Sequence, residues 1–232
     1  GELLKLQSIE KVALAALIFC VASSATHILH DLTDIERDRR HPKKSKSRPL
    51  ASGLVSVTQA ITLLLILYVT LLAAWFVMSA VLYVVLGYLL LNLAYTFVLK
   101  HQPVIDIFTI AIGFVLRVYA GAMALSVPVS SWMFVTTLCL ALYLAAVKRG
   151  QELASNGSDS REVLQHYTPA LIDRYAEMAA TGALLFYSLF VMTARPAMVM
   201  TIPLVRYGLY RYWFNVESKD CGESPTDALL GD

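Results

Sequence analysis

Three aspartates in the first fifth of the chain have a spacing that suits a metal site. They are Asp31, Asp34 and Asp38, at positions i, i+3 and i+7, so on a helix all three carboxylates lie on one face. Converging carboxylates repel one another unless a cation neutralises them. Mg²⁺ suits such hard oxygen ligands and commonly bridges carboxylates to the phosphates of a substrate. The spacing therefore predicts a catalytic Mg²⁺ site at these three residues.

Basic residues follow the aspartates within a few positions. The candidates for phosphate binding are Lys44, Lys46 and Arg48, because arginine grips a phosphate as a fork and lysine acts as a point charge. Opposite charges packed into one segment indicate a site for a Mg²⁺-complexed diphosphate. For the basic residues alone, the alternative is a solvated loop that only sets the membrane topology.

Further polar candidates lie in the apolar segments or at their ends. Arg117 stands inside an apolar run, where a charge is costly and is usually functional or paired, so we expect it to bind a phosphate or a carboxylate. Asp106, with Lys100 nearby, is a candidate for substrate binding, the alternative being a helix cap. Tyr95, one turn after Asn92, could hydrogen-bond a sugar or phosphate, and simple packing is the alternative.

The segments that carry these residues are typical of a helical membrane protein. Of the 232 residues, 57% are hydrophobic and 16% charged, with a mean hydropathy of +0.61, whereas a soluble domain carries about 25% charged residues. The apolar runs are long enough to cross a bilayer as helices and do not alternate as barrel strands do. We therefore expect an all-α polytopic transmembrane bundle. Seven spans are predicted, at roughly 11–30, 56–78, 80–99, 104–126, 131–148, 171–194 and 196–214.

The basic residues also predict the orientation of the chain. Cytoplasmic loops carry an excess of Lys and Arg, and most of the 19 in this chain fall on the side of segment 31–55. The opposite side holds Lys5, Lys11 and Arg195. The Asp31 loop is therefore predicted to be cytoplasmic. Because this places Gly1 outside, we expect the chain to lack a first helix.

The motifs resemble those of a known family. HDLTDIERDRRHPKK and the following RPLASG are similar to the first Asp-rich motif of the UbiA-type prenyltransferase superfamily, N-x-x-x-D-x-x-x-D. The HP and RPLASG flanks, with LNLAYTFVLK, GFVLRVYAGA, KRGQEL and YTPALIDR further on, resemble its decaprenyl-phosphate phosphoribosyltransferase-like branch. The resemblance covers nearly the whole chain. It implies a single domain, 1–232, of a nine-helix fold that is truncated at both ends and lacks the first and last helices.

The resemblance also singles out a second segment. Where aromatic prenyltransferases of the superfamily carry a second D-x-x-x-D motif, this chain reads KRGQE, with Lys148, Arg149 and Glu152. Two cations and one carboxylate suit direct phosphate binding better than a second metal cage, and ordinary topology-setting anchors are the alternative for the two cations. Tyr167 lies in the polar segment that follows, without a definite role.

Two positions depart from the family pattern. His30 stands where the family has asparagine, and His27 stands where a tyrosine is usual. His30 is therefore a further candidate metal ligand, although imidazole prefers transition metals to Mg²⁺. A catalytically impaired relative stays an alternative for this reason.

The function implied by the resemblance is Mg²⁺-dependent transfer of phosphoribose from phosphoribosyl pyrophosphate to a polyprenyl phosphate. The alternative within the superfamily moves a prenyl group from its diphosphate to an aromatic or other small acceptor. The implied partners are a polyprenyl lipid, a soluble diphosphate donor and the membrane, with no nucleic acid and with oligomer formation left open. The implied location is a bacterial-type inner membrane, with the active-site loops in the cytoplasm.

Overall fold

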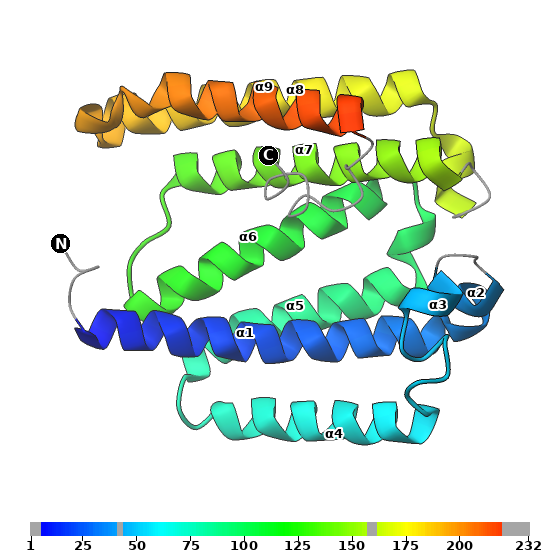
Figure 1. Cartoon of the computed structure of the whole chain (residues 1–232). Coiled ribbons are helices and arrows are strands. Elements are labelled where there is room, and N and C mark those ends of the chain that lie inside the picture. The colour runs from blue at the N-terminus through cyan, green and yellow to red at the C-terminus, as the bar shows by residue number, and fades with distance from the viewer. Residues whose placement is uncertain (1–5, 41–43, 157–161, 220–232) are drawn as a thin grey trace. The chain divides into compact units, whose positions relative to one another are not determined.

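The computed structural model describes residues 6–40, 44–156 and 162–219, and within these ranges the chain forms helices and no strands (Figure 1). In chain order the elements are α1 (Leu6–Thr33), α2 (Ile35–Arg40), α3 (Lys44–Ser47), α4 (Val57–Ala74), α5 (Ser79–Phe97), η2 (Leu99–His101), α6 (Ile105–Leu125), α7 (Ser131–Asn156), η4 (Glu162–His166), α8 (Pro169–Ala194), η5 (Pro196–Met198) and α9 (Thr201–Lys219).

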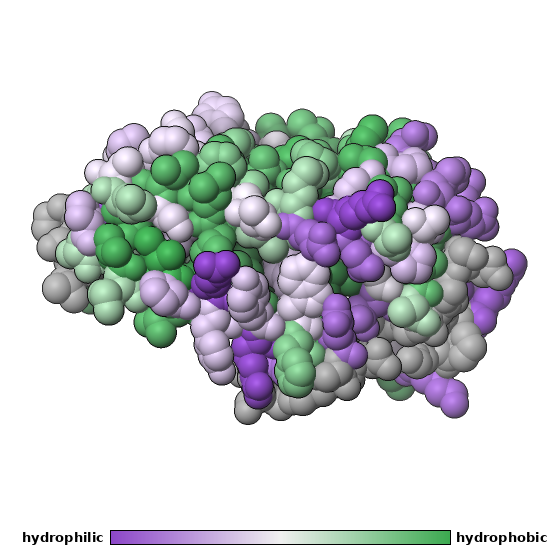
Figure 2. Space-filling model, turned by 90° about the horizontal axis from the view of Figure 1, so that it is seen from above, coloured by the Kyte–Doolittle hydropathy of each residue, from purple (hydrophilic) through white to green (hydrophobic). Residues whose placement is uncertain are grey.

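Six of these helices are long and apolar enough to cross a membrane: α1, α4, α5, α6, α7 and α8. They correspond to the first six predicted spans, so the predicted all-α polytopic fold is confirmed. Many large apolar side chains on them are exposed, among them Leu63, Leu65 and Ile66 of α4, as lipid-facing side chains should be. Figure 2 shows apolar residues covering broad areas of the face in view.

The seventh predicted span, 196–214, is helical but more polar than the other six. Residues Pro196–Met198 form η5, and α9 follows from Thr201 to Lys219. This helix is not among the six candidates for crossing the membrane, because Arg206, Arg211 and Glu217 interrupt its apolar run. The structure therefore gives six candidate spans in the described residues, where the sequence predicted seven.

The chain divides into two compact units, and α6 contributes to both. The first unit consists of 1–97 and 116–128. In it, α1 packs against α4 and α5, as Figure 1 shows. The buried side chains of this unit include the small residues Ala15 and Ala22 of α1 and the larger Phe19 and Tyr88. Small residues allow membrane helices to approach closely, which explains why α1 can be the centre of this unit.

The second unit consists of 98–115 and 129–232. Its core lies between α7 and α8, and α9 packs against α8, so that the three run side by side in Figure 1. Gly182 of α8 permits the close approach to α7, because a Cβ at this position would lie 3.0 Å from the Cys139 sulfur. Tyr143 and Leu164 are fully buried in this core.

Candidate functional site

The aspartate segment bridges the end of one helix and the start of the next. Helix α1 ends at Thr33, Asp34 lies in a bend, and α2 begins at Ile35. The single continuous helix assumed for the aspartate spacing is thus interrupted. Helical backbone hydrogen bonds from residue i to residue i−4 nevertheless continue through the bend. The Asp34 N–H donates to the His30 carbonyl (2.9 Å), and the Asp38 N–H donates to the Asp34 carbonyl (2.8 Å).

Arg48 joins two of the three aspartates. Its Nη1 donates to Asp31 Oδ1 and lies 3.2 Å from Asp38 Oδ2. Asp38 is only 4% exposed, and its Oδ2 pairs with Arg48 by charge, without the geometry of a hydrogen bond. Two of the three aspartates therefore converge on one cation, which is a guanidinium 17 residues away from Asp31, and their role as Mg²⁺ ligands stays a prediction.

This arrangement fits Mg²⁺ only together with a substrate. Within the described residues, no group of three or more His, Cys, Asp or Glu side chains is placed to hold a metal ion, so Asp34 does not complete a cage with Asp31 and Asp38. Mg²⁺ in phosphate-transfer sites, however, is usually held by one or two carboxylates plus substrate phosphates. The convergence of Asp31 and Asp38 on a cation meets that requirement, and the two carboxylates retain one more negative charge than Arg48 neutralises.

His30 and Tyr95 lie together beside the aspartate segment. Their ring centroids are 5.8 Å apart, and the His27 ring lies 6.4 Å from that of His30. The nearby Asn92 uses its side-chain amide to donate to the Tyr88 carbonyl one turn earlier (2.8 Å). The structure thus gives His30 and Tyr95 a packing role, and their roles as metal ligand and substrate ligand stay predictions.

Arg117 is anchored on aromatic rings in the first unit. Its guanidinium carbon lies 5.8 Å from the ring centroids of both Phe19 and Tyr88, and its Nη2 lies 3.5 Å from the Tyr88 hydroxyl. Cation–π contacts of this kind stabilise a charge in an apolar setting. The contacts of Arg117 thus include aromatic rings and a hydroxyl, and the expectation that it binds a phosphate or a carboxylate stays a prediction.

The predicted phosphate-binding lysines differ in their surroundings. Lys46 and Lys148 are exposed, whereas Lys100 of η2 is half-buried. The side chain of Lys44 lies outside the described residues. Of the two basic candidates in segment 44–48 whose side chains are described, Lys46 and Arg48, Arg48 is the one that pairs with the aspartates.

The second unit contains a buried polar network around Asp106 and Arg149. Arg149 is 1% exposed and Asp106 is 0% exposed. The Arg149 Nε donates to Asp106 Oδ2 (2.7 Å) and its Nη1 donates to Glu152 Oε2 (2.6 Å). The Tyr167 hydroxyl donates to Asp106 Oδ1 (2.7 Å) and accepts the Val104 N–H (2.7 Å). Each polar side chain of this network thus has a hydrogen-bond or ion-pair partner within it, and a charge buried away from water requires such a partner.

This network changes how the KRGQE segment is understood. Arg149 and Lys148 are adjacent in sequence, yet Arg149 is buried and Lys148 is exposed, because successive helical residues point about 100° apart. Arg149 already binds two carboxylates. To bind a phosphate it would have to exchange a hydrogen bond to a carboxylate for one to the phosphate, and that role stays a prediction.

Tyr167 is the member of this network that the sequence left without a role. Burial chiefly raises the pKa of Tyr167, the Val104 N–H partly opposes this, and the bond to Asp106 reinforces it. The hydroxyl therefore stays neutral and can donate. Two sequence signals drew attention to it, namely its place directly before Thr168 and Pro169, which begin α8, and its position as the first residue of the family-like YTPALIDR segment.

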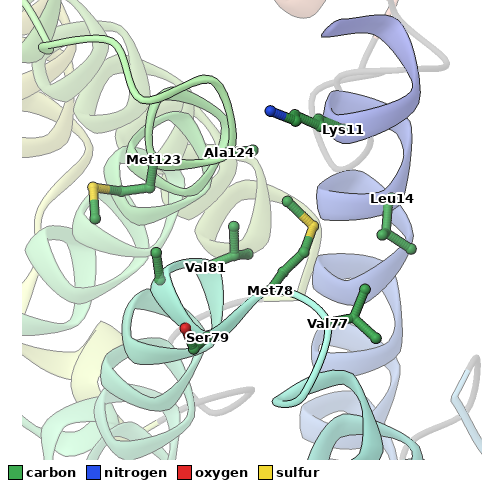
Figure 3. A pocket seen from close by; sticks show the side chains of 9 residues that line it. Lys11, Leu14, Val77, Met78, Ser79, Val81, Met123 and Ala124 are labelled. Atoms are coloured by element: carbon green, nitrogen blue, oxygen red, sulfur yellow. The ribbon is translucent and has the colours of Figure 1, made fainter. Parts of the chain in front are cut away.

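A hollow of about 390 Å³ lies at the other end of α1 from the aspartates. Figure 3 shows it between the first turns of α1, the connection from α4 to α5, and the last turn of α6, with the Lys11 ammonium extending across it. Its lining is otherwise mostly apolar, as with Leu14, Met78 and Met123. Within the part of the chain that the structure describes, none of the predicted site residues lines this hollow, and the location of the chemistry at the aspartates stays a prediction.

Comparison with known proteins agrees with this fold. The UbiA prenyltransferase family matches residues 5–226. The chain is 33% identical over 233 residues to a decaprenyl-phosphate phosphoribosyltransferase from Mycobacterium tuberculosis, covering 97% of this chain and 76% of that protein. A protein of the same name from Corynebacterium glutamicum is 31% identical, covering 97% of this chain and 71% of the relative.

A solved structure shares the same architecture. It is that of a UbiA homolog from Archaeoglobus fulgidus bound to GPP and Mg²⁺, with a TM-score of 0.78 and 20% sequence identity, covering 98% of this chain and 83% of that one. At this identity the likeness concerns the fold, and it confirms that the helices of this chain follow a known membrane-protein arrangement.

Proposed function

The chain belongs to the UbiA prenyltransferase family, and we propose that it transfers phosphoribose from phosphoribosyl pyrophosphate to a polyprenyl phosphate. The family and the named relatives make it a transferase, and its apolar helices make it an integral membrane protein. The choice of donor and acceptor is supported by the two relatives named decaprenyl-phosphate phosphoribosyltransferase, each of which matches 97% of this chain. In this proposal both units belong to one domain, because the family match runs through both.

The observation that carries the proposal is the convergence of Asp31 and Asp38 on the Arg48 guanidinium. These two carboxylates would hold Mg²⁺, which neutralises the leaving diphosphate and fixes its position. Arg48, once its carboxylates are shared with a metal, is free to donate to the phosphate oxygens that arrive with the donor. No protein nucleophile is required, since the acceptor phosphate is already anionic. Asp34, one turn from each, would orient this site through the second coordination shell.

The second candidate function uses the same carboxylates on a different donor. It moves a prenyl group from its diphosphate to a small acceptor. The observation that favours it is the fold shared with a UbiA homolog bound to GPP and Mg²⁺ in one structure and to DMAPP and Mg²⁺ in another. A catalytically impaired relative is the third candidate, because His30 packs on Tyr95 where the family pattern has asparagine.

Labelled donors test the proposal directly. Membranes containing the protein are supplied with a polyprenyl phosphate and labelled phosphoribosyl pyrophosphate, or with labelled prenyl diphosphate and an aromatic acceptor, each with Mg²⁺ or with EDTA. The proposal expects Mg²⁺-dependent incorporation of phosphoribose into lipid. Incorporation of the prenyl label alone would favour the second candidate, and no donor binding in the presence of Mg²⁺ would favour the third.

Substitutions tie the activity to the aspartates. An Asp31→Asn plus Asp38→Asn variant should lose at least about a hundredfold in turnover, since both proposed metal ligands are removed. Glu36→Gln is the matched control, because Glu36 lies in the same segment, is 72% exposed and pairs with Arg39 alone among the described contacts. Full turnover by the double variant would rule out this site.

A further inference from the structure

A strained turn precedes α6 in the second unit. Val104 has a positive φ of 68°, which is unfavourable for a β-branched residue. The Ile105 N–H donates to the Pro103 carbonyl across this single residue (2.8 Å), so Val104 is the centre of a γ-turn of the strained, positive-φ form. Strain of this kind persists only where the surroundings hold it, and it concentrates at functional sites.

One side chain holds this turn. The Tyr167 hydroxyl accepts the N–H of Val104 itself and donates to Asp106 Oδ1, two residues further on, both at 2.7 Å. Asp106 is in turn fixed by the buried Arg149, which Glu152 holds from its other side. The turn is therefore tied at two points to a network whose Asp106 and Arg149 are at most 1% exposed.

The segment directly before the turn carries Lys100. It forms η2 (Leu99–His101), which packs against η4 (Glu162–His166). A second tie between the two is the pair of His101 Nδ1 and Glu162 Oε2 at 3.1 Å, but both of these side chains are exposed. Exposed pairs contribute little to stability, so the buried bonds of Tyr167 are the stronger restraint on this segment.

We propose that Tyr167 is a positioning residue that clamps the Val104 turn and thereby fixes the η2 segment, with Lys100, for the anionic diphosphate donor. The proposal rests on the proposed function in one respect, namely that Lys100 binds a phosphate of the donor. It does not depend on which diphosphate the protein uses. Tyr167 acts through the backbone of the turn and takes no part in the chemical step.

A double-variant cycle separates positioning from general stability. Tyr167→Phe removes the hydroxyl, so Val104 can leave its strained conformation and η2 shifts. Val104→Gly removes the backbone strain that drives this change, because glycine adopts a positive φ without strain. We expect Tyr167→Phe to raise the donor KM about ten- to hundredfold, the range that follows from a small misplacement of a binding group. The acceptor KM should stay within about twofold, and Val104→Gly added to Tyr167→Phe should restore most of the loss.

The readouts include one that needs no activity. Hydrogen exchange of the peptide spanning 98–106 should quicken at least about tenfold in Tyr167→Phe, since the Val104 amide loses its acceptor and η2 is released. In the double variant the His101 and Gln102 amides, which donate to the Val98 and Leu99 carbonyls, should slow again, whereas the amide of residue 104 stays without its acceptor. Tyr207→Phe is the matched control, because Tyr207 is a tyrosine of α9 that is 66% exposed. It should change neither exchange nor KM.

These experiments test the Tyr167 clamp independently of the proposed reaction. The kinetics use whichever diphosphate donor the wild-type protein turns over, so a wrong donor in the proposed function leaves the test intact. If the wild type turns over neither donor, the exchange pattern decides alone. The clamp is refuted if Tyr167→Phe leaves exchange and donor KM unchanged. It is also refuted if Val104→Gly restores neither, because a merely structural tyrosine would not be rescued by relieving strain three helical segments away in sequence.

Discussion

Arg48 pairs with both carboxylates that we propose as metal ligands. Its guanidinium pairs with Asp31 and Asp38, which otherwise face each other as like charges. A metal–diphosphate complex bound at the same carboxylates would replace Arg48 in this role. The contribution of Arg48 to stability should therefore depend on whether such a complex is present.

Arg48→Gln tests this dependence. In EDTA we expect the substitution to lower the free energy of unfolding by about 1–2 kcal/mol, because it leaves the buried Asp38 without its cation, while Asp31 and Arg48 are partly exposed. For a chain of this size, this change corresponds to a fall in Tm of about 2–8 °C. With Mg²⁺ and inorganic pyrophosphate the difference from wild type should shrink. Thermal unfolding in detergent measures both.

The control for this variant is Arg39→Gln. Arg39 pairs with Glu36 at 3.2 Å, and both side chains are about half or more exposed, so its loss should change stability by less than about 1 kcal/mol under either condition. If Arg48→Gln is equally destabilised with and without Mg²⁺ and pyrophosphate, the carboxylates and the metal complex are not linked as proposed.

The pH dependence of Tyr167 follows from the direction of its pKa shift. Its pKa in the folded protein is raised above the ordinary value of 10.0, so the neutral form stabilises the fold. This stabilisation is fully present below the ordinary value and is lost only as the pH rises through the raised one. The bond to Asp106 should therefore hold throughout the neutral range, and any loss of activity at mildly alkaline pH has another cause.

Tyrosinate absorbance can measure this shift. The difference in absorbance between wild type and Tyr167→Phe should show no ionisation at pH 10.0, the ordinary midpoint, as long as the protein is folded. Appearance of half a tyrosinate at that pH would mean that the hydroxyl is not held in the buried network. The same titration in denaturant, where the ordinary value returns, is the internal control.

The start of α4 shows which parts of an element the sequence could predict. Ser56 caps this helix by accepting the Gln59 N–H, while the Gln59 side chain accepts the Ser56 N–H. Such a capping box is local and can be identified from sequence. The predicted span began at 56, and the helix begins at Val57. Apolar run length also predicted the approximate positions of the six apolar helices, although α1 (Leu6–Thr33) begins before its predicted start at 11 and α7 (Ser131–Asn156) continues past its predicted end at 148.

Ser56→Ala tests the cap. Loss of the side-chain acceptor should cost about 1 kcal/mol, which for a chain of this size lowers Tm by about 2–4 °C. Ser52→Ala is the control, since the Ser52 hydroxyl is exposed and only donates to the Pro49 carbonyl in a turn. An equal effect of the two substitutions in thermal unfolding would show that the capping box adds nothing to α4.

The pairings between elements could not be predicted in the same way. Asp31 and Arg48 are 17 residues apart, Arg149 and Asp106 are 43 apart, and Tyr167 and Asp106 are 61 apart. Charge and spacing singled out Asp31 and Arg48 as functional candidates, whereas Arg149 was singled out by the family resemblance. Which carboxylate meets which cation depends on how the helices pack, and no local pattern encodes that. The break at Asp34 escaped prediction because the aspartate spacing is equally consistent with an unbroken helix.

The molecule as a whole combines a lipid-facing apolar surface with polar groups gathered at the helix ends and in small buried networks. Each of the two units has a core of its own. The sequence predicted this division of apolar and polar residues well, because hydropathy alone determines it. The seventh predicted span corresponds to α9, which carries charges along its length and is not among the six candidate spans of the described residues.

The length of α1 makes the sidedness of the protein testable. Its 28 residues extend about 42 Å at 1.5 Å per residue, more than the roughly 30 Å of the bilayer core. We therefore expect Lys11, near its start, and Lys46, beyond its end, to lie on opposite sides of the membrane. Because basic residues gather on the Lys46 side, we expect that side to be cytoplasmic.

Single cysteines decide this orientation. In a background without the three native cysteines, Lys46→Cys should react with a membrane-impermeant maleimide only in inside-out vesicles, and Lys11→Cys only in right-side-out vesicles. Both positions are exposed in the structure, so permeabilised vesicles should label both and serve as the control. Labelling of the two from the same side would mean that α1 does not cross the membrane. The reversed pattern would place the aspartate segment outside, where a donor made in the cytoplasm could not reach it, and would contradict the proposed reaction as well as the topology.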